Sequence, residues 1–492
     1  MQLLLDLDGR GDTPLQQQIF EQLRAAILGG RLNPGQRMPS SRDLCAQINV
    51  SRNTVALAYE RLLAEGYIET RHGVGTFVNL MLPEAALRSR RQPVHLVEAT
   101  NVPPPPRYAG PFRGQRPALY VSGPQAELIC DFRIGRPDPD SFPVKAWRRM
   151  AARFLSRPSP MLTQYGDPAG VPTLRSAIAR HVAAARGIVV QPEQILIVAG
   201  VQEALTLVAR MFLSPGAQVV MELPTYQGAA FSFMSFGAEL RPTRTDQAGL
   251  IVNEIQGPAP ELAYVTPSHQ FPLGYTLSLE RRLQLLDLAA KKGFYIIEDD
   301  YDGDFRFQSS PLTALQGLDI RERVLYTTTF SKSIGAGLRL GYLIVPPHLV
   351  EPFTTAKALL NSGHPLLDQM IVAEFIDSGQ FDNHLRRIRM LYMQRRDCLL
   401  DALNRHFGTC RITGQESGMH LCWHLPNTLP SAPRMQEIAA KVGVGIYSLT
   451  AGHAYTFNDK KGLDRIVMLG YPSVPEARIK RGIRDLAAAV LK

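Results

Sequence analysis

The sequence predicts an α/β protein made of two folded parts of very different size. Residues 1–78 show helical periodicity interrupted by short turns, and residues 79–130 show little pattern. From about residue 131 onward, short apolar segments alternate with amphipathic helices. Such alternation is typical of βαβ units, which build a parallel sheet. The predicted strands are 195–199, 218–222, 262–266, 294–299, 324–329 and 341–345.

Composition restricts the class of protein. Of the 492 residues, 45% are apolar and 20% are charged, as in a globular protein. No uninterrupted apolar run is long enough to predict a membrane span. The first residues, MQLLLDLDGRGD, place acids where a secretion signal needs a basic start, so we expect a cytoplasmic protein. Five cysteines without a CxxC pair predict neither a disulfide framework nor a metal site.

The net charge of +10 favours a polyanionic partner but does not locate its binding site. Residues 1–78 contain eight arginines and eight acidic residues, so the excess positive charge lies elsewhere in the chain. A prediction of nucleic-acid binding must therefore rest on a motif and not on charge.

Three helices are expected in residues 1–78. The first lies within PLQQQIFEQLRAAILGG, where apolar side chains recur on one face and two glycines end the helix. A short second helix begins at Ser40 or Ser41, and Ser51 caps a third helix that ends at Gly66. The residues expected to point inward are Leu15, Ile19, Leu23, Ile27, Leu28, Leu44, Ile48, Val55, Leu62 and Leu63.

Two short strands, Tyr67–Glu69 and Thr76–Val78, follow and complete a winged helix-turn-helix. In this fold the start of the third helix faces a DNA groove, where Arg52 suits guanine and Asn53 suits adenine. The alternative is a solvated helix with an ordinary hairpin, which the complete string disfavours. The predicted DNA contacts are Arg42, Ser51, Arg52, Asn53, Thr54 and His72.

Residues 10–78 resemble the GntR family of winged-helix repressors. The matching motifs are PGQRMPSSRDL, VSRNTV, AYERLLAEGYIE and GVGTFV. The resemblance implies that Arg42, Arg52, Thr54 and His72 approach double-stranded DNA.

Residues 79–130 are predicted to be an Arg/Pro-rich linker. Four consecutive prolines, Pro103–Pro106, exclude a helix and favour an extended spacer. At about 3.1 Å per residue such a spacer permits the first part to reach a partner subunit.

A single lysine marks a second predicted site. The chain contains ten lysines against 44 arginines, and Lys332 is the only charged residue between Arg323 and Arg339. A lysine in a neutral Ser/Thr/Gly segment after an apolar strand suits a lowered pKa and Schiff-base chemistry. Thr329, Ser331 and Arg339 offer hydroxyl and guanidinium groups to a phosphate. The alternative is a surface lysine on a loop.

Upstream strands supply the other groups of this predicted site. Asp299 ends the strand FYIIED, where α/β folds bind ligands, and a pyridinium nitrogen needs such a carboxylate. ILIVAGVQEAL predicts strand, glycine and helix, so the amides of Val201 and Gln202 can bind a phosphate. Tyr226, after another strand, can stack on a flat ring.

These motifs, with FRIGRPDPDSFP, LTQYGDPAGVPTLRSAIA and TPSHQFPLGYTLS, resemble fold type I pyridoxal-phosphate enzymes over roughly residues 130–492. The resemblance implies that pyridoxal 5'-phosphate is attached to Lys332, with Asp299 at its pyridine nitrogen and Tyr301 near its phenolic oxygen. It further implies phosphate contacts from Arg339, Thr329 and the amides of Val201 and Gln202, and a stacked Tyr226. Tyr165 would contact the phosphate of the neighbouring subunit, which implies a homodimer.

Two features depart from that family. Phe271 stands where an asparagine usually opens an Asn-Pro-x-Gly turn, so His269 or Gln270 is needed as a substitute. The arginine expected to bind an effector carboxylate is assigned to Arg465, before IVMLGY, and the alternative for Arg465 is a surface ion pair.

The combination of the two parts, with TPSHQFPLG and EDDYDGDFRF, resembles the MocR/GabR-type regulators. It implies a transcription regulator whose aminotransferase-like domain senses an amino compound or pyridoxal phosphate. The alternatives are an active aminotransferase that carries a regulatory DNA-binding domain, and a DNA-binding protein whose second fold is only structural. The predicted domains are 1–78 (DNA-binding), 79–130 (linker) and 131–492 (aminotransferase-like), with a small domain over about 350–492.

Overall fold

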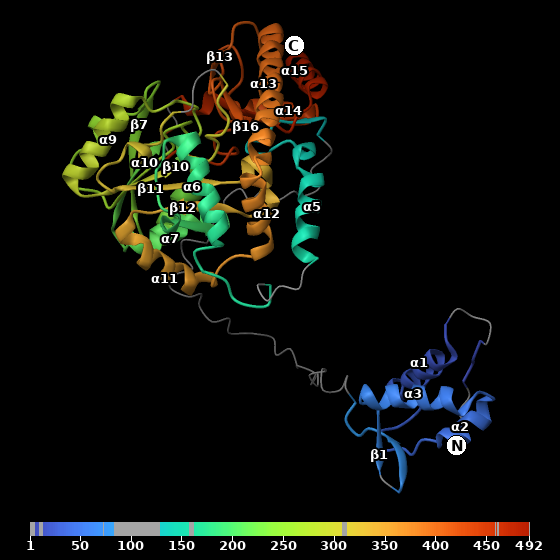
Figure 1. The fold of residues 1–492 in the computed structure, drawn as a ribbon. Coiled ribbons are helices and arrows are strands. Elements are labelled where there is room, and N and C mark those ends of the chain that lie inside the picture. The colour runs from blue at the N-terminus through green and yellow to red at the C-terminus, as the bar shows by residue number, and fades with distance from the viewer. Residues whose placement is uncertain are drawn as a thin grey trace, which may run out of the picture. The chain divides into compact units, whose positions relative to one another are not determined.

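The computed structural model describes residues 5–8, 13–71, 73–82, 128–156, 162–307, 312–457, 459 and 462–491. The chain divides into two compact units, Met1–Pro105 and Pro106–Lys492 (Figure 1). His72 and most of the predicted linker, residues 83–127, lie outside the described residues.

The smaller unit has three helices followed by a two-stranded hairpin: α1 (Leu15–Leu28), α2 (Ser41–Ile48), α3 (Arg52–Ala64), β1 (Ile68–Arg71) and β2 (Gly75–Val78). Ser40 caps α2 by accepting from the Asp43 amide at 3.1 Å, and Ser51 caps α3 by accepting from the Thr54 amide at 3.1 Å. Asn49, with φ of 52°, makes the turn between these helices. The predicted winged helix-turn-helix is confirmed.

The core of the smaller unit corrects two details of the expected inward face. Ile27 and Leu62 are fully buried, but Leu28 is 44% exposed and Leu63 is 47% exposed. Each of these leucines directly follows a buried residue, and a step of about 100° along the helix turns it away from the core.

The larger unit is built on an eight-stranded sheet of order β4-β12-β11-β10-β9-β5-β7-β8. Five neighbouring strands of this sheet run parallel to one another: β11, β10, β9, β5 and β7. At one end of the sheet, β12 runs antiparallel to both β11 and β4, and at the other end β8 runs antiparallel to β7. The carboxyl ends of β10 and β11 therefore meet at one edge of the sheet. The bounds are β4 (Ile195–Val198), β5 (Gln218–Leu223), β7 (Glu239–Asp246), β8 (Gly249–Leu250), β9 (Leu262–Val265), β10 (Tyr295–Asp299), β11 (Val324–Thr329) and β12 (Gly341–Ile344).

Helices cover both faces of this sheet (Figure 1). Leu196 and Val198 of β4 pack in one core with helices α7, α8 and α11, whereas Ile195 and Ile197 pack in another with α6 and α12. Helix α9 covers the β9 and β10 side of that second face. Burial on both faces explains why these strands are continuous apolar runs. The helices are α6 (Pro172–Arg186), α7 (Val201–Phe212), α8 (Gln227–Ser235), α9 (Leu279–Lys292), α11 (Val350–Asn361) and α12 (Leu366–Asp377).

A second, four-stranded sheet has the order β13-β14-β18-β16. The helix α13 is 28 residues long and packs along α15, and its last residue, Phe407, stacks near Trp423 of β14 with 4.7 Å between ring centroids. The bounds are β13 (Arg411–Thr413), β14 (His420–His424), β16 (Tyr447–Ser448), β18 (Ile466–Gly470), α13 (Gln380–Phe407), α14 (Ala432–Lys441) and α15 (Glu476–Val490).

The remaining elements are short or peripheral. Two small strand pairs join β3 to β15 in parallel and β6 to β17 in antiparallel fashion. Among the described residues, no helix combines the length and the apolar character that crossing a membrane requires. The bounds are α5 (Val144–Leu155), α10 (Leu315–Leu318), β3 (Cys130–Asp131), β6 (Thr225–Tyr226), β15 (Val444–Gly445) and β17 (Ala454–Tyr455).

Candidate functional site

Lys332 lies at the edge of the large sheet where β10 and β11 end. It belongs to the helical turn Ser331–Gly335, directly after β11, and its Nζ donates to the carbonyl oxygen of Gly135 at 2.8 Å. Burial of the amine lowers the pKa of Lys332, against the opposing charges of Asp302 and Asp299. A lowered pKa keeps a larger share of the amine neutral, which a nucleophilic lysine requires.

Asp299, the last residue of β10, is buried with one oxygen unpaired. Its Oδ2 accepts from the hydroxyl of Tyr264 at 2.7 Å, and its Oδ1 has no hydrogen-bond partner. Burial raises the pKa of Asp299 to about 7. Because an unpaired buried polar atom costs about 1–3 kcal/mol, Oδ1 marks a place for a donor from a ligand.

Tyr301 is paired with His269 rather than with Gln270. The Tyr301 hydroxyl lies 3.0 Å from His269 Nδ1. The Gln270 amide instead donates to the carbonyl oxygens of Pro224 and Phe271, and its Oε1 accepts from the Leu273 amide. Of the two substitutes expected from the sequence, only His269 reaches the predicted ring-binding group.

Sequence reasoning missed the buried cluster around His269. His269, Asp302 and His420 each offer one atom that could coordinate a metal ion, and these three atoms lie within 4.8 Å of one another. Asp302 is 2.8 Å from His269 Nδ1, and His420 Nε2 lies 2.8 Å from the carbonyl oxygen of Pro272. These hydrogen bonds engage one ring nitrogen of each histidine, whereas His269 Nε2 has no partner. Only the acid-rich segment EDDYDGD could have pointed to Asp302.

The first turn of α7 forms a cradle for an anion together with Arg339. Gly200 precedes the helix with φ of +105°, and a Cβ added to it would lie 3.2 Å from Arg339 Nη2. The guanidinium therefore lies against the Gly200 backbone. The amides of Val201 and Gln202 are in the first turn, where no helical carbonyl is available, and the helix dipole adds positive potential there.

Two predicted phosphate ligands, Thr329 and Ser331, lie next to each other at the end of β11. Thr329 Oγ1 donates to Ser331 Oγ at 2.8 Å and accepts from the Ser331 amide at 3.1 Å. This pair fixes the backbone immediately before Lys332.

The cradle predicts a large effect of Gly200→Ala. We expect the affinity for pyridoxal phosphate to fall by about tenfold or more, because the new Cβ strains a backbone with positive φ and displaces Arg339. An absorbance titration of cofactor-free protein measures this. Gly337→Ala is the matched control, since no atom lies within 4 Å of a Cβ at Gly337. An equal loss of affinity in Gly200→Ala and Gly337→Ala would contradict the assignment of Gly200 and Arg339 to the phosphate site.

Tyr226, Tyr165 and Arg465 have different surroundings. Tyr226 is half-buried, and its ring meets the Phe271 ring edge-on with 5.7 Å between centroids. Tyr165 is 94% exposed and is not brought to Lys332 of its own chain. Arg465 is also not brought there, because its guanidinium donates to the carbonyl oxygens of Leu425, Pro426 and Leu429.

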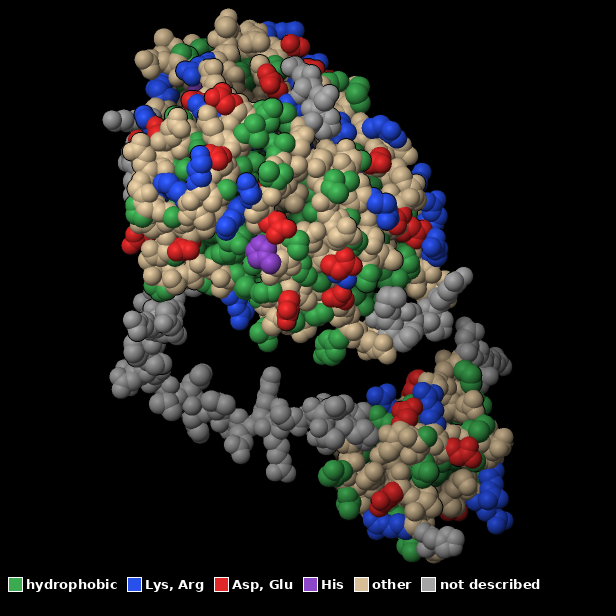
Figure 2. Space-filling view, turned by 60° about the vertical axis from the view of Figure 1, so that its left-hand side comes forward, with side chains coloured by type: hydrophobic (Ala, Val, Ile, Leu, Met, Phe, Trp, Pro, Cys, Tyr) green, Lys and Arg blue, Asp and Glu red, His purple; other side chains and the backbone are tan. Residues whose placement is uncertain are grey.

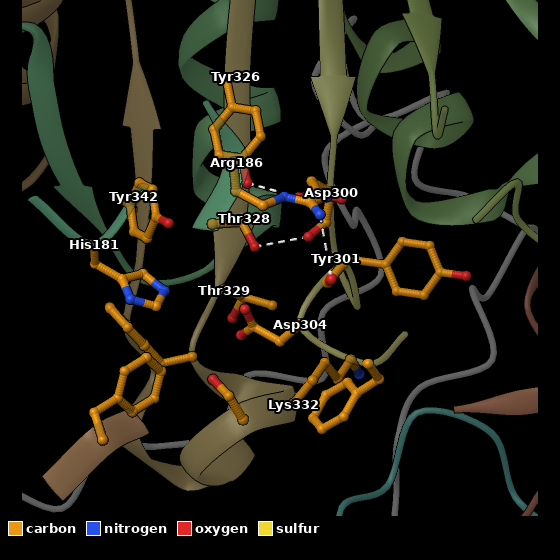
Figure 3. Close-up of a pocket in the computed structure, with 15 residues that line it drawn as sticks. His181, Arg186, Asp300, Tyr301, Asp304, Tyr326, Thr328, Thr329, Lys332 and Tyr342 are labelled. Carbon is orange, nitrogen blue, oxygen red and sulfur yellow. Dashed lines mark hydrogen bonds and ion pairs between the residues drawn. The ribbon is translucent and has the colours of Figure 1, made fainter. Parts of the chain in front are cut away.

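Asp300 ties the two strands beneath this site to α6 (Figure 3). The Asp300 carboxylate accepts from Arg186 and from the Tyr326 hydroxyl, the latter at 2.7 Å. Thr328 Oγ1 donates to the Asp300 carbonyl oxygen at 2.8 Å. Lys332 lies on the turn that follows Tyr326 and Thr328, so the contacts of Asp300 help to fix its position.

A second buried acid makes stability depend on pH. Glu222 Oε2 accepts from the amide and hydroxyl of Thr266 at 3.0 and 2.7 Å, whereas Oε1 is unpaired. Burial raises the pKa of Glu222 from 4.5 to about 7. A raised acid pKa stabilises the fold at low pH, and this contribution is lost as pH rises from the unfolded value toward about 7.

We therefore expect Glu222→Gln to stabilise the cofactor-free protein more at pH 8 than at pH 5. The amide oxygen can replace Oε2, and the variant avoids ionising a buried acid, a gain of at most about 3 kcal/mol. Thermal unfolding at the two pH values measures the effect. The exposed Glu193→Gln is the control. A gain that is equal at both pH values would show that titration of Glu222 is not its cause.

The predicted DNA contacts gather at the starts of α2 and α3. Arg42, Ser51, Arg52 and Asn53 are exposed there. Thr54 is half-buried, with its Oγ1 2.7 Å from Ser51 Oγ. On the face shown in Figure 2, Lys and Arg side chains are interspersed with acidic ones on both units.

Sequence reasoning missed Arg37, which lies on the wing. The Arg37 backbone bridges Phe77 of β2, and a Cβ at Gly75 would lie 3.1 Å from Arg37 Nε. Because this bridge joins residues 40 positions apart, no local pattern revealed it.

Arg52→Ala is expected to weaken specific operator binding by about 1–3 kcal/mol and to relax base preference at one position. The side chain is exposed at the start of α3, where we expect it to reach a base edge. Binding to systematically varied operators measures both effects. Arg153→Ala on α5 of the larger unit is the control for charge. A uniform loss at every sequence would assign Arg52 to phosphate contact instead.

Both units match known families. Residues 15–78 match the bacterial regulatory proteins of the gntR family, and residues 129–468 match aminotransferase class I and II. The probable rhizopine catabolism regulatory protein MocR of Rhizobium meliloti is 35% identical over 99% of this chain and 96% of its own length. The HTH-type pyridoxine biosynthesis transcriptional regulator PdxR of Corynebacterium glutamicum is 31% identical over 99% and 98%.

Solved structures match the larger unit. The multiple substrate aminotransferase of Thermococcus profundus superposes with a TM-score of 0.67 and 30% identity, over 76% of this chain and 93% of that one. The solved structure matches the larger unit, and the full-length relatives match both units. The chain therefore belongs to the transcription regulators in which a gntR-family DNA-binding domain is joined to an aminotransferase class I and II domain.

Proposed function

We propose that the larger unit binds pyridoxal 5'-phosphate at Lys332 and makes DNA binding responsive to an amino compound or to the cofactor itself. The observation that carries the proposal is the unpaired Oδ1 of Asp299, buried at the sheet edge where Lys332 lies. The name of the relative PdxR supports including the cofactor among the candidate effectors.

The residues of this chain suit that group. When bound, pyridoxal phosphate supplies an aldehyde, which condenses with a primary amine and releases water, and an electron-accepting ring. Lys332 offers the amine, and Asp299 keeps a proton on the ring nitrogen. Tyr226 stacks on the ring. The phosphate is held by Arg339, Thr329, Ser331 and the amides of Val201 and Gln202.

The remaining assignments belong to the same proposal. Arg42, Ser51, Arg52, Asn53, Thr54 and His72 contact a double-stranded operator in the cytoplasm. The chain works as a homodimer, in which the exposed Tyr165 contacts the partner's phosphate. Arg465 remains our candidate for an effector carboxylate, provided that it leaves its present carbonyl partners. The DNA-binding domain, linker and aminotransferase-like domain occupy 1–78, 79–130 and 131–492.

The absorbance spectrum of the purified protein tests the proposal. We expect a yellow protein whose visible band changes on addition of one class of amino compounds, and the same compounds should change operator affinity in gel-shift titrations. A protein that takes up no pyridoxal phosphate at any concentration would refute it.

An active aminotransferase is the second candidate, because Lys332 and Asp299 serve transamination equally well. The Thermococcus profundus enzyme supports it by its structural match. Release of an oxo acid from a panel of amino acids, at rates that Lys332→Ala abolishes, would establish it. If amino acids bind but no oxo acid is released, the proposal of an active aminotransferase is refuted and only that of a regulator is retained.

A further inference from the structure

His269 lies between an acid and the predicted ring-binding tyrosine. Its Nδ1 is 2.8 Å from Asp302 Oδ2 and 3.0 Å from the Tyr301 hydroxyl. His269 and Asp302 are 2% and 3% exposed, so no solvent competes for these contacts. The three side chains come from two loops at the carboxyl edge of the large sheet, after β9 and after β10.

The hydrogen bonds determine which nitrogen of His269 carries the proton. An ionised Asp302 only accepts hydrogen bonds, so Nδ1 must donate to it. Nε2 has no partner and faces Gly274 and Gly414, where an added Cβ would lie 3.1 Å away. A neutral ring leaves only a lone pair unsatisfied at Nε2, whereas a charged ring would leave a buried N–H unsatisfied.

This tautomer constrains Tyr301. Its oxygen lies beside the Nδ1–H donor, so its own proton must point elsewhere. Burial raises the pKa of Tyr301 well above its usual range, and Asp302 and Asp299 add to the effect. The phenol therefore keeps its proton, and a side-chain hydrogen bond joins it to Asp302. A ring oxygen on the side away from His269 would replace Asp302 as the acceptor of that proton.

We propose that Asp302 and His269 are positioning residues that hold the Tyr301 hydroxyl as a donor toward the ring oxygen of bound pyridoxal phosphate, in place of an asparagine amide. The inference rests on the proposed function. A donor at the ring oxygen weakens the attraction between that oxygen and a proton on the nitrogen that joins Lys332 to the cofactor. The pair thereby lowers the pH at which this nitrogen loses its proton.

Other charged or titratable groups act on the same atoms and remain constant in the test. Besides Asp302, Asp299 and Arg339 act on the Lys332 amine, and Asp299 and Cys422 act on Tyr301. His420 and His453 are held neutral because burial lowers the pKa of each to about 4. These groups are unchanged in the variants below.

Two substitutions of one residue separate the proposal from a structural role. The amide nitrogen of His269→Asn takes the place of Nδ1, whereas that of His269→Gln takes the place of Nε2. In the cofactor-loaded protein, we expect the pH midpoint of the visible absorbance change to rise by about one unit in His269→Gln. His269→Asn and the exposed control His348→Gln should stay near wild type. Equal midpoints in His269→Asn and His269→Gln would overturn the proposal.

A second measurement needs no cofactor. In cofactor-free protein labelled with nitrogen-15 at histidine, the signals that disappear in His269→Asn should come from a ring protonated at Nδ1 at neutral pH. Asp302→Ala should move that proton to Nε2. A wild-type ring protonated at Nε2 overturns the proposal even if the cofactor binds. Failure of cofactor uptake with the Nδ1 proton in place would refute the proposed function alone.

Discussion

Lys332→Ala is expected to abolish covalent attachment of pyridoxal phosphate and the response to effector, while operator binding persists. The substitution removes the amine that lies at the carboxyl edge of β11. The winged-helix unit has its own hydrophobic core, so it folds without that amine. Borohydride reduction followed by peptide mass analysis measures the attachment, and gel shifts measure the response.

The control for this prediction is Lys291→Ala, which removes an exposed lysine of α9. It should retain the full adduct. A reduced adduct on a lysine other than Lys332 in the wild-type protein would show that the site is misassigned. Loss of operator binding in Lys332→Ala would show that the two units are more tightly coupled than we propose.

The second large effect concerns operator geometry. Moving the two half-sites apart by about five base pairs, half a helical turn, should abolish high-affinity binding, whereas a full turn should be tolerated better. In the homodimer that we propose, two winged-helix units must meet the same side of the duplex. Effector can change this preference only through different affinities for two arrangements of the dimer.

Gel-shift titrations with a series of spacings measure this effect, with and without effector. A single half-site is the control, since it reports the affinity of one unit. Equal affinity at every spacing would mean that the two units bind independently, and the regulation proposed here would then have to act by another route.

The sequence predicted the architecture well because the decisive signals are local. All six predicted strands are present, and 324–329 matches β11 residue for residue. Fully buried strands are continuous apolar runs. The capping residues Ser40 and Ser51 predict the starts of α2 and α3. The errors at Leu28 and Leu63 arose because both residues lie at the edge of an apolar stripe, where one step of rotation decides exposure.

The site was predictable only where its groups follow strands. Lys332 and Asp299 stand at the ends of β11 and β10, so the parallel pairing brings them to one edge. The choice between His269 and Gln270 was not predictable, because a one-residue step decides which of them reaches Tyr301. The surroundings of Arg465 depend on carbonyl groups some 40 positions away, which no pattern in its own segment reveals.

The long helix α13 has a mechanical consequence. Near its start, His384 Nε2 lies 2.7 Å from the carbonyl oxygen of Ser333, next to Lys332, and at its end Phe407 stacks near Trp423 of the second sheet. At about 1.5 Å per residue these points are about 35 Å apart. A tilt of about 3° at His384 then moves Phe407 by about 2 Å. A tilt of this helix too small to rearrange the Lys332 turn would therefore displace side chains of the second sheet by more than a bond length.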